Sequence, residues 1–166
     1  MIKFDSIISE KIFNIIKAGL FYFLIYGLIG WLIDSIFDSL VFGYLVLGGM
    51  FRSFLLPIPF APIYGFGALV LISFKKIFWN KSPWIILPTV GVIINTIEYF
   101  GGVLTLLVLG RRAWDYSGSF ANLHGHINLL HGILWMFLGY AFIKIIHPHV
   151  EKIAQKYIFS QSTAPF

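Results

Sequence analysis

The sequence predicts an all-α protein, a polytopic transmembrane helical bundle with four spans and one re-entrant or broken segment. Of the 166 residues, 58% are hydrophobic and 11% are charged, whereas about a quarter of the residues in a soluble domain are charged. The apolar residues gather into segments of about 20 residues, the length that a helix needs to cross a bilayer. The lysines stand near the ends of these segments, as is typical of membrane proteins.

Residues 1–17 are predicted to form an interfacial amphipathic helix. Their isoleucines recur near helical spacing and their lysines fall elsewhere, which is typical of a helix lying in the membrane surface. An extension of the first span fits the same residues, and both interpretations stay open. Charged residues and the lack of a small-residue cleavage site argue against a cleavable signal peptide, so the first span is expected to act as an uncleaved insertion signal.

The transmembrane domain is expected over residues 18–148. Its four apolar segments are residues 18–37, 62–79, 84–109 and 127–146. The second segment is slightly short for a span. Residues 40–59 are also apolar, but glycines and prolines interrupt them, which favours a broken or re-entrant segment sheltered by the bundle over a fifth span. A helix end is expected near Pro148, which leaves residues 149–166 as a cytoplasmic C-terminal tail.

The basic residues predict the orientation of this domain. With four spans, the 12 Lys and Arg residues fall on two sides. One side holds Lys3, Lys11, Lys17, Lys75, Lys76, Lys81, Lys144, Lys152 and Lys156, and the other holds Arg52, Arg111 and Arg112. By the positive-inside rule both termini are expected to be cytoplasmic, and the chain is expected to be a multi-pass protein of the cell membrane. This distribution explains the formal charge of +5 without a nucleic-acid partner.

Ionisable residues within the apolar segments are candidate functional groups, because a charge in hydrocarbon persists only when it is paired, hydrated or used. Glu98 lies well inside the third predicted span, and Asp34 lies near the outer end of the first. Arg52 is the expected partner of Glu98 if its segment re-enters the bundle. An ion pair that fixes helix register and a substrate or proton site both stay open for Glu98.

Polar residues near Glu98 and in the predicted outer connection extend this candidate site. Asn95 can share a helix face with Glu98, and Tyr99 can donate a hydrogen bond to a ligand or a neighbour; helix packing is the alternative for both. The run Trp114-Asp115-Tyr116-Ser117 is typical of an aromatic belt with a turn. An arginine pair with Asp115 that locks the loop, or a rim that selects charged ligands, fits this run.

Two further patterns have structural and functional interpretations. Pro62, Gly65 and Gly67 favour a helix start and close backbone approach, and the free amides of that start could attract an anion. His124 and His131 are seven residues apart and share a helix face, but His126 points elsewhere, so no metal site is predicted. These residues are better explained as histidines that form hydrogen bonds within the helical bundle, or as groups that bind and release protons.

Several chemistries lack their sequence patterns. The chain has no cysteine, and it contains neither a phosphate-binding loop ending in Lys-Ser or Lys-Thr nor a G-x-S-x-G or H-E-x-x-H motif. No cofactor is therefore predicted, and the chain cannot hydrolyse ATP through such a loop. A hydrolase or lipid transferase that uses Asp115 or Glu98 with a histidine stays an alternative.

Five strings together resemble a family of bacterial membrane proteins described as putative ABC-transporter type IV permeases. They are FLIYGLIGWLIDSIF (23–37), PIYGFGALVL (62–71), NTIEYFGGVLTLLVLG (95–110), WDYSGSFANLHGHINLLHGILW (114–135) and IHP (146–148). The family usually has Glu near Asp34, and an Arg-Gly pair where this chain has Phe51-Arg52-Ser53. His126 follows the Asn-x-x-Gly element where the family usually has Arg, so it could bind an anion only when protonated.

The resemblance implies a permease-like subunit of a transport system, with the ATPase on a separate polypeptide. Because four short spans enclose little volume, a homo-oligomer or a partner subunit is expected if the protein transports a solute. The protein is expected to lie in the lipid bilayer of a bacterial inner membrane. The alternatives are a membrane scaffold or regulatory protein without transport, and an intramembrane enzyme acting on lipid or envelope precursors. The candidate substrate or polar-centre residues are Asp34, Arg52, Tyr64, Asn95, Glu98, Tyr99, Trp114, Asp115, Tyr116, Asn122 and His126.

Overall fold

The computed structural model describes residues 2–43 and 59–157, and it is all-α apart from one two-residue strand pair, as the sequence predicts. The elements are α1 (Ile2–Phe42), α2 (Pro62–Phe78), α3 (Pro83–Leu109), β1 (Asn122–Leu123), β2 (Ile127–Asn128), α4 (Leu129–Ala141), the π-helical η2 (Phe142–Ile146) and α5 (His147–Tyr157). The expected re-entrant segment, residues 40–59, lies mostly outside the described residues.

Three helical stretches within the described residues are long and apolar enough to cross a membrane. They are Ser9–Phe37 in α1, Pro83–Leu109, and the continuous helix Leu129–Tyr157. Helix α2, which occupies the second predicted segment, has 17 residues and is shorter. Helix α1 is unbroken from Ile2 to Phe42, so the N-terminal segment continues directly into the first span.

The expectation of a helix end near Pro148 is wrong. The chain passes from α4 through η2 into α5 without a break, and the His147 backbone N–H donates to the carbonyl of Phe142, five residues back. Proline lacks the N–H that an α-helical turn needs, and the wider π turn just before it accommodates this loss within a continuous helix.

Helix ends elsewhere follow local sequence signals. The Ser82 side chain accepts a hydrogen bond from the Trp84 N–H, and Pro83 occupies the first turn of α3. That helix ends at Gly110, which has a left-handed φ of 65°. The Asn128 side chain caps α4 by accepting from the His131 N–H, so α4 begins at Leu129 rather than at residue 127.

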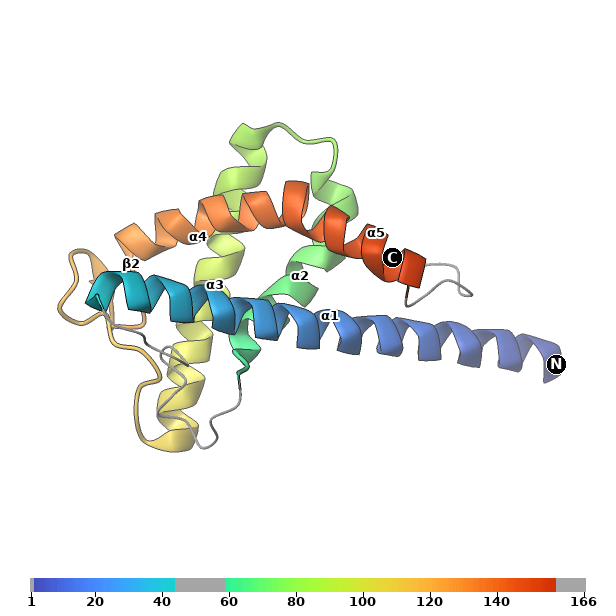
Figure 1. The fold of residues 1–166 in the computed structure, drawn as a ribbon, viewed down its shortest axis with the longest axis horizontal. Helices are drawn as coiled ribbons and strands as arrows, with labels where there is room; N and C mark the ends of the chain where they lie inside the picture. Colours follow the sequence, from blue (N-terminus) through green and yellow to red (C-terminus); the bar gives the residue numbers. More distant parts are fainter. Residues whose placement is uncertain (1, 44–58, 158–166) are drawn as a thin grey trace.

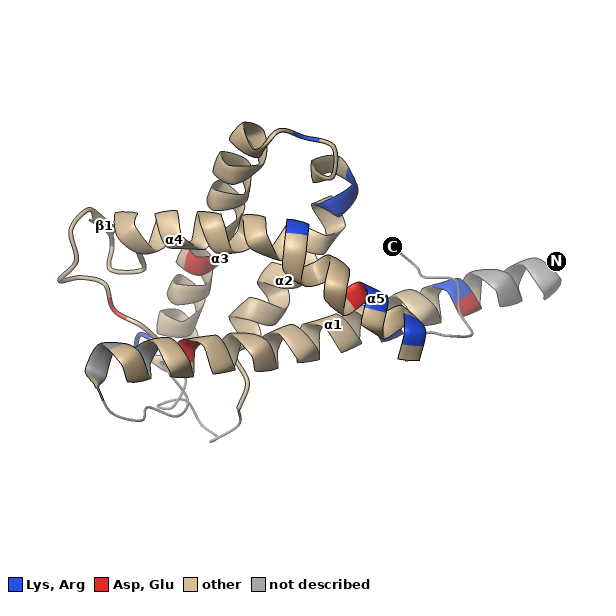
Figure 2. Ribbon diagram, turned by 45° about the horizontal axis from the view of Figure 1, so that its top comes forward, with Lys and Arg blue, Asp and Glu red and all other residues tan. Residues whose placement is uncertain are grey.

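The helices pack as two close pairs, α1 with α2 and α3 with α4, through glycines. A Cβ atom at Gly30 would lie 2.1 Å from the Tyr64 ring, and one at Gly139 would lie 2.4 Å from Val90. Small residues allow such approach between membrane helices. Figures 1 and 2 show α3 running across the direction that α1 and the α4–α5 helix share, with α2 between them.

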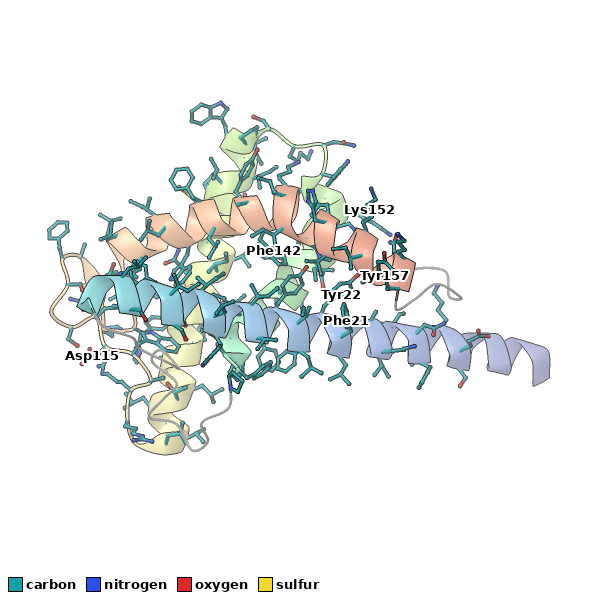
Figure 3. The ribbon with its side chains drawn as sticks, viewed as in Figure 1. Phe21, Tyr22, Asp115, Phe142, Lys152 and Tyr157 are labelled. Carbon is teal, nitrogen blue, oxygen red and sulfur yellow. The ribbon has the colours of Figure 1, made fainter. Side chains whose placement is uncertain are left out.

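The end of the molecule that carries α5 holds a polar and aromatic cluster. The Tyr26 hydroxyl and Nδ1 of His147 form a 2.9 Å hydrogen bond, and Tyr22 packs edge-on against His147. Figure 3 shows Tyr22 and Phe142 between α1 and the α4–α5 helix, far from Asp115. Most described Lys and Arg positions gather toward this end (Figure 2), including Lys75, whose Nζ lies 2.6 Å from the Glu151 carboxylate.

Candidate functional site

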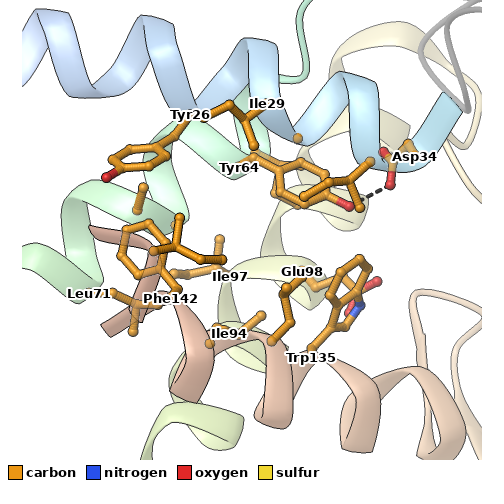
Figure 4. A pocket seen from close by; sticks show the side chains of 18 of the residues that line it. Tyr26, Ile29, Asp34, Tyr64, Leu71, Ile94, Ile97, Glu98, Trp135 and Phe142 are labelled. Carbon is orange, nitrogen blue, oxygen red and sulfur yellow. Dashed lines mark hydrogen bonds between the residues drawn. The ribbon is translucent and has the colours of Figure 1, made fainter. Parts of the chain in front are cut away.

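A cavity of about 130 Å³ lies between α1, α2, α3 and the α4–η2 helix. Most of its wall is aliphatic. The rings that line it are those of Tyr26, Tyr64, Trp114, Trp135 and Phe142, and the carboxyl groups are those of Asp34 and Glu98. Figure 4 shows Tyr26 and Phe142 at one end of the cavity, and Asp34, Glu98 and Trp135 toward the other. The cavity therefore concentrates its charge at the end away from α5.

Glu98 lies in the middle of α3 and is only 6% exposed. Its Oε1 accepts a hydrogen bond from the Tyr116 hydroxyl at 3.1 Å. Its Oε2 is buried and has no hydrogen-bond partner among the described residues. The Trp135 indole lies beside this carboxyl group (Figure 4), and its Nε1 also lacks a partner there. Each unpartnered buried polar group costs about 1–3 kcal/mol, so Glu98 carries an unmet demand for a donor or a positive charge.

Asp34 is held at the same end of the cavity by Tyr64. The Tyr64 hydroxyl donates a hydrogen bond to Oδ1 of Asp34 across the α1–α2 contact. The Tyr64 ring meets Trp135 edge-on, with ring centroids 5.7 Å apart and planes at 81°. Because the base of the Tyr64 ring occupies the space above Gly30, this position tolerates no larger residue without movement of a helix.

The loop between α3 and α4 covers Glu98 with two aromatic residues of the WDYS run. Trp114 is buried, and its indole N–H donates to the His126 carbonyl at 2.8 Å. Tyr116 is buried as well: its backbone N–H donates to the Gly125 carbonyl, and its ring stacks on His131 with the ring centroids 4.5 Å apart. The loop therefore places the Tyr116 hydroxyl directly on the buried carboxylate.

Polar residues of the same loop hold its shape. Ser117 donates to Oδ1 of Asp115 from both its hydroxyl and its backbone N–H, and these hydrogen bonds are the main reason that the pKa of Asp115 is lowered. The Arg112 guanidinium lies 3.7 Å from that carboxylate, which is the local pair that the sequence allowed. Asn122 accepts from the Gly125 N–H, and its amide donates to the Ser117 carbonyl, so Asn122 closes the turn.

His126 is a packing residue in this structure. Its ring covers Gly102, where a Cβ atom would lie 2.6 Å from Nδ1, and it meets Tyr99 edge-on at 5.5 Å. Burial, followed by the nearby Arg112, lowers the pKa of His126 and so favours the neutral imidazole. His124 points to Tyr99, whose hydroxyl lies 2.8 Å from its Nδ1. Over residues 2–43 and 59–157, no group of three or more metal-ligating side chains converges.

The structure brings some of the candidate residues together and separates others. Asp34, Tyr64, Glu98 and Trp114 line the cavity, and Tyr116 contacts Glu98 from the loop. Asp115, Asn122, Tyr99 and His126 lie in or against the loop but do not line the cavity. The Asn95 amide donates to the Gly132 carbonyl at 3.3 Å, so it joins α3 to α4. Arg52 lies outside the described residues, and so does its predicted pair with Glu98.

Trp135, which lies beside Glu98, is a cavity residue that the sequence analysis did not single out. It belongs to α4 and lies four residues after His131, on the same helix face. Tryptophan in a membrane span is ordinarily found at the interface, so a tryptophan well inside an apolar helix was a usable signal for a buried polar contact.

The family model described as Putative ABC-transporter type IV matches residues 21–163, which include every described residue of this cavity. No curated protein and no solved structure matches the chain.

Proposed function

The chain belongs to the putative ABC-transporter type IV family, and from that premise we propose that it is an integral membrane, permease-like subunit of a transport system. The observation that carries the proposal is the Glu98 carboxyl group, which is buried at a cavity between the helices with one oxygen lacking a partner in the described part of the chain. Glu98, Asp34 and Tyr64 form its polar centre, and the loop with Trp114 and Tyr116 gates it.

A buried Glu98 carboxyl group that nothing satisfies would destabilise the protein in the membrane. An ionisable group in a membrane span is expensive and is ordinarily satisfied by a partner, by water or by a transported species. Asn95 is an example of a polar residue whose hydrogen-bonding groups have partners within the protein. Its side-chain amide donates to two backbone carbonyls, those of Gly91 and Gly132. Among the described residues, only the Tyr116 hydroxyl forms a hydrogen bond with the Glu98 carboxyl group, and Glu98 lines a cavity, which suits a group that binds and releases a ligand.

The proposed topology has four spans and both termini in the cytoplasm of a bacterial cell. Helix α2, the second along the chain, would cross the membrane in addition to the three longer helical stretches. Its 17 residues extend about 26 Å, close to the hydrocarbon thickness of about 30 Å. Lys75 and Lys76 in its last turn would lie on the cytoplasmic side with α5, while the Trp114 loop would face outward. Residues 1–17 would lie at the interface, and residues 149–166 would form the cytoplasmic end.

One small subunit with a cavity of this size would need other chains to supply the energy for transport and to complete the path of the solute across the membrane. A separate ATPase subunit and a second copy of this chain are the proposed partners. The competing function is a membrane scaffold or regulator, and the Asn95 bridge between α3 and α4 is the observation that favours it. In that case Glu98 and Asp34 act only on helix assembly.

The test compares solute uptake in cells that lack the chain and are complemented with variants. Uptake of isotope-labelled solutes from a defined medium is measured by mass spectrometry, together with the amount of each variant in the membrane. Wild type and Thr96→Val should restore the same solute, because Thr96 is exposed and its hydroxyl bonds only its own helix. Glu98→Gln should reach the membrane equally but restore little uptake. Full restoration by Glu98→Gln would contradict the proposal and favour the scaffold.

A further inference from the structure

We propose that this cavity binds a small organic cation with an apolar body, such as an alkylammonium ion, with Glu98 as its counter-ion and the Tyr64 and Trp135 rings as its walls. The inference rests on the proposed function and names the class of substrate for the same site. It depends on four properties of the cavity: its unmet polar group, its aromatic walls, its size and the ligands that it excludes.

The first property is the charge of the side chains that line the cavity. Both charged side chains among the described residues of the cavity wall are acids, Asp34 and Glu98, and that part of the wall holds no Lys, Arg or His. Oε2 of Glu98 is an acceptor, more than nine-tenths buried with its residue, and it forms no hydrogen bond with a described residue, although the Trp135 indole lies beside the carboxyl group (Figure 4). A bound cation would satisfy this oxygen from the cavity, which Glu98 and Trp135 both line.

The second property is the nature of the surfaces beside this carboxylate. Tyr64 and Trp135 pack edge to face at 81°, so their rings form two non-parallel walls next to Glu98. Aromatic faces attract ammonium groups by about 0.5–2 kcal/mol each, and most strongly where water is excluded. The remaining wall is aliphatic and suits the alkyl part of the same ligand.

The third property is size. The cavity volume is about 130 Å³. An apolar cavity of about 150 Å³ takes up a benzene molecule, so this one admits a compact ligand of similar size. A tetramethylammonium or choline head fits that limit, whereas a peptide or a sugar chain does not.

The fourth property is what the cavity disfavours. An anion would meet two carboxyl groups at low dielectric. Ca²⁺ needs about six to eight oxygen ligands and Mg²⁺ about six. The side-chain oxygens of the described wall are those of Asp34, Glu98, Tyr64 and Tyr26, and Tyr26 lies at the opposite end of the cavity (Figure 4). A neutral apolar molecule would leave Oε2 of Glu98 without a partner. A cation carrying alkyl groups meets the acid, the rings and the aliphatic wall together.

The test measures radiolabelled choline binding to the full chain, purified in a maltoside detergent, by equilibrium dialysis. Tetramethylammonium should compete, whereas 3,3-dimethylbutan-1-ol, the neutral isostere of choline, should not. Glycerophosphocholine should compete poorly, because its phosphate meets the two acids; equal competition would overturn the assignment to a free cation. Glu98→Gln should weaken choline binding at least tenfold, and Thr96→Val should leave it unchanged.

A second variant guards against a folding defect. Trp135→Phe keeps an aromatic wall and should retain most of the affinity, whereas Trp135→Leu should lose several-fold, with both variants monodisperse on size exclusion. Equal binding of choline and its neutral isostere would overturn the inference, and so would the absence of binding by both choline and tetramethylammonium. The uptake test gives an independent result. If choline binds but no solute uptake depends on Glu98, the cavity is a cation site and the proposed transport function is wrong.

Discussion

Replacing Gly30 by alanine tests the close contact between α1 and α2 that places Tyr64 at the cavity. A Cβ atom at this position would lie 2.1 Å from Cγ and 2.4 Å from Cβ of Tyr64, while ordinary van der Waals contact begins at 3.4 Å. The overlap with Cγ is therefore about 1.3 Å, the difference between 3.4 and 2.1 Å. Both atoms stand at the base of the ring, where rotation of the side chain brings little relief, so the helices must separate.

The expected loss of stability follows from two opposing effects. Forcing a methyl group into a packed contact costs about 1–3 kcal/mol, and the position of the overlap points to the upper part of that range. Alanine is favoured over glycine within a helix by about 1 kcal/mol. The net loss in the free energy of unfolding is about 1–2 kcal/mol, which lowers the unfolding midpoint by about 2–8 °C in a chain of this length.

The assay heats purified protein in maltoside detergent and measures the fraction that stays monodisperse on size exclusion. Gly19→Ala is the matched control, because it lies on the same helix and nothing stands within 4 Å of its added Cβ atom. That variant should be as stable as wild type or more stable. If Gly30→Ala and Gly19→Ala unfolded at the same temperature, the contact between Gly30 and Tyr64 would be looser than the structure has it, and the reasoning would fail.

Two further predictions concern the ends of the molecule. The half-buried pair of Lys75 and Glu151, whose side chains are 17% and 16% exposed, should show a coupling of about 1 kcal/mol in a double-mutant cycle of Lys75→Met and Glu151→Gln; additive effects would refute it. Ser117 lowers the pKa of Asp115 below 3.8, so the ionised carboxylate stabilises the folded loop at neutral pH and this contribution disappears as pH falls through the lowered value. The protection of the Ser117 amide, meaning its exchange rate relative to that of an unfolded chain at the same pH, should therefore decrease in acid in wild type, and should be low and independent of pH in Asp115→Asn.

The helices were predictable from local signals, and their ends only in part. Long apolar runs located α1, α2, α3 and α4 but not α5, and the cap at Ser82 needs only neighbouring residues. The rule that proline ends a helix failed at Pro148, because the preceding π turn accommodates the missing donor. No sequence period announces a π turn of five residues, so local reasoning had no means to foresee it.

The acids of the candidate site were predictable, and their surroundings were not. Glu98 is conspicuous in an apolar run, and the cost of burying it makes it a candidate without any structure. Its contacts with Tyr116 and Trp135 join elements that are distant along the chain, so they depend on how α3, α4 and the loop pack. The same reason explains why Asp115 and His126, which look equally polar in the sequence, lie away from the cavity.

The π turn in η2 also sets the rotational phase of the helix that follows it. Successive residues of an α-helix are about 100° apart, so one residue more or fewer between Phe142 and Ile146 would turn α5 by about that angle. In the observed phase, His147 meets Tyr26 and Glu151 meets Lys75. A single change of length would carry both side chains more than a quarter turn away from these partners. Substitutions in this stretch alter one contact at a time, whereas an insertion or deletion alters the whole C-terminal face at once.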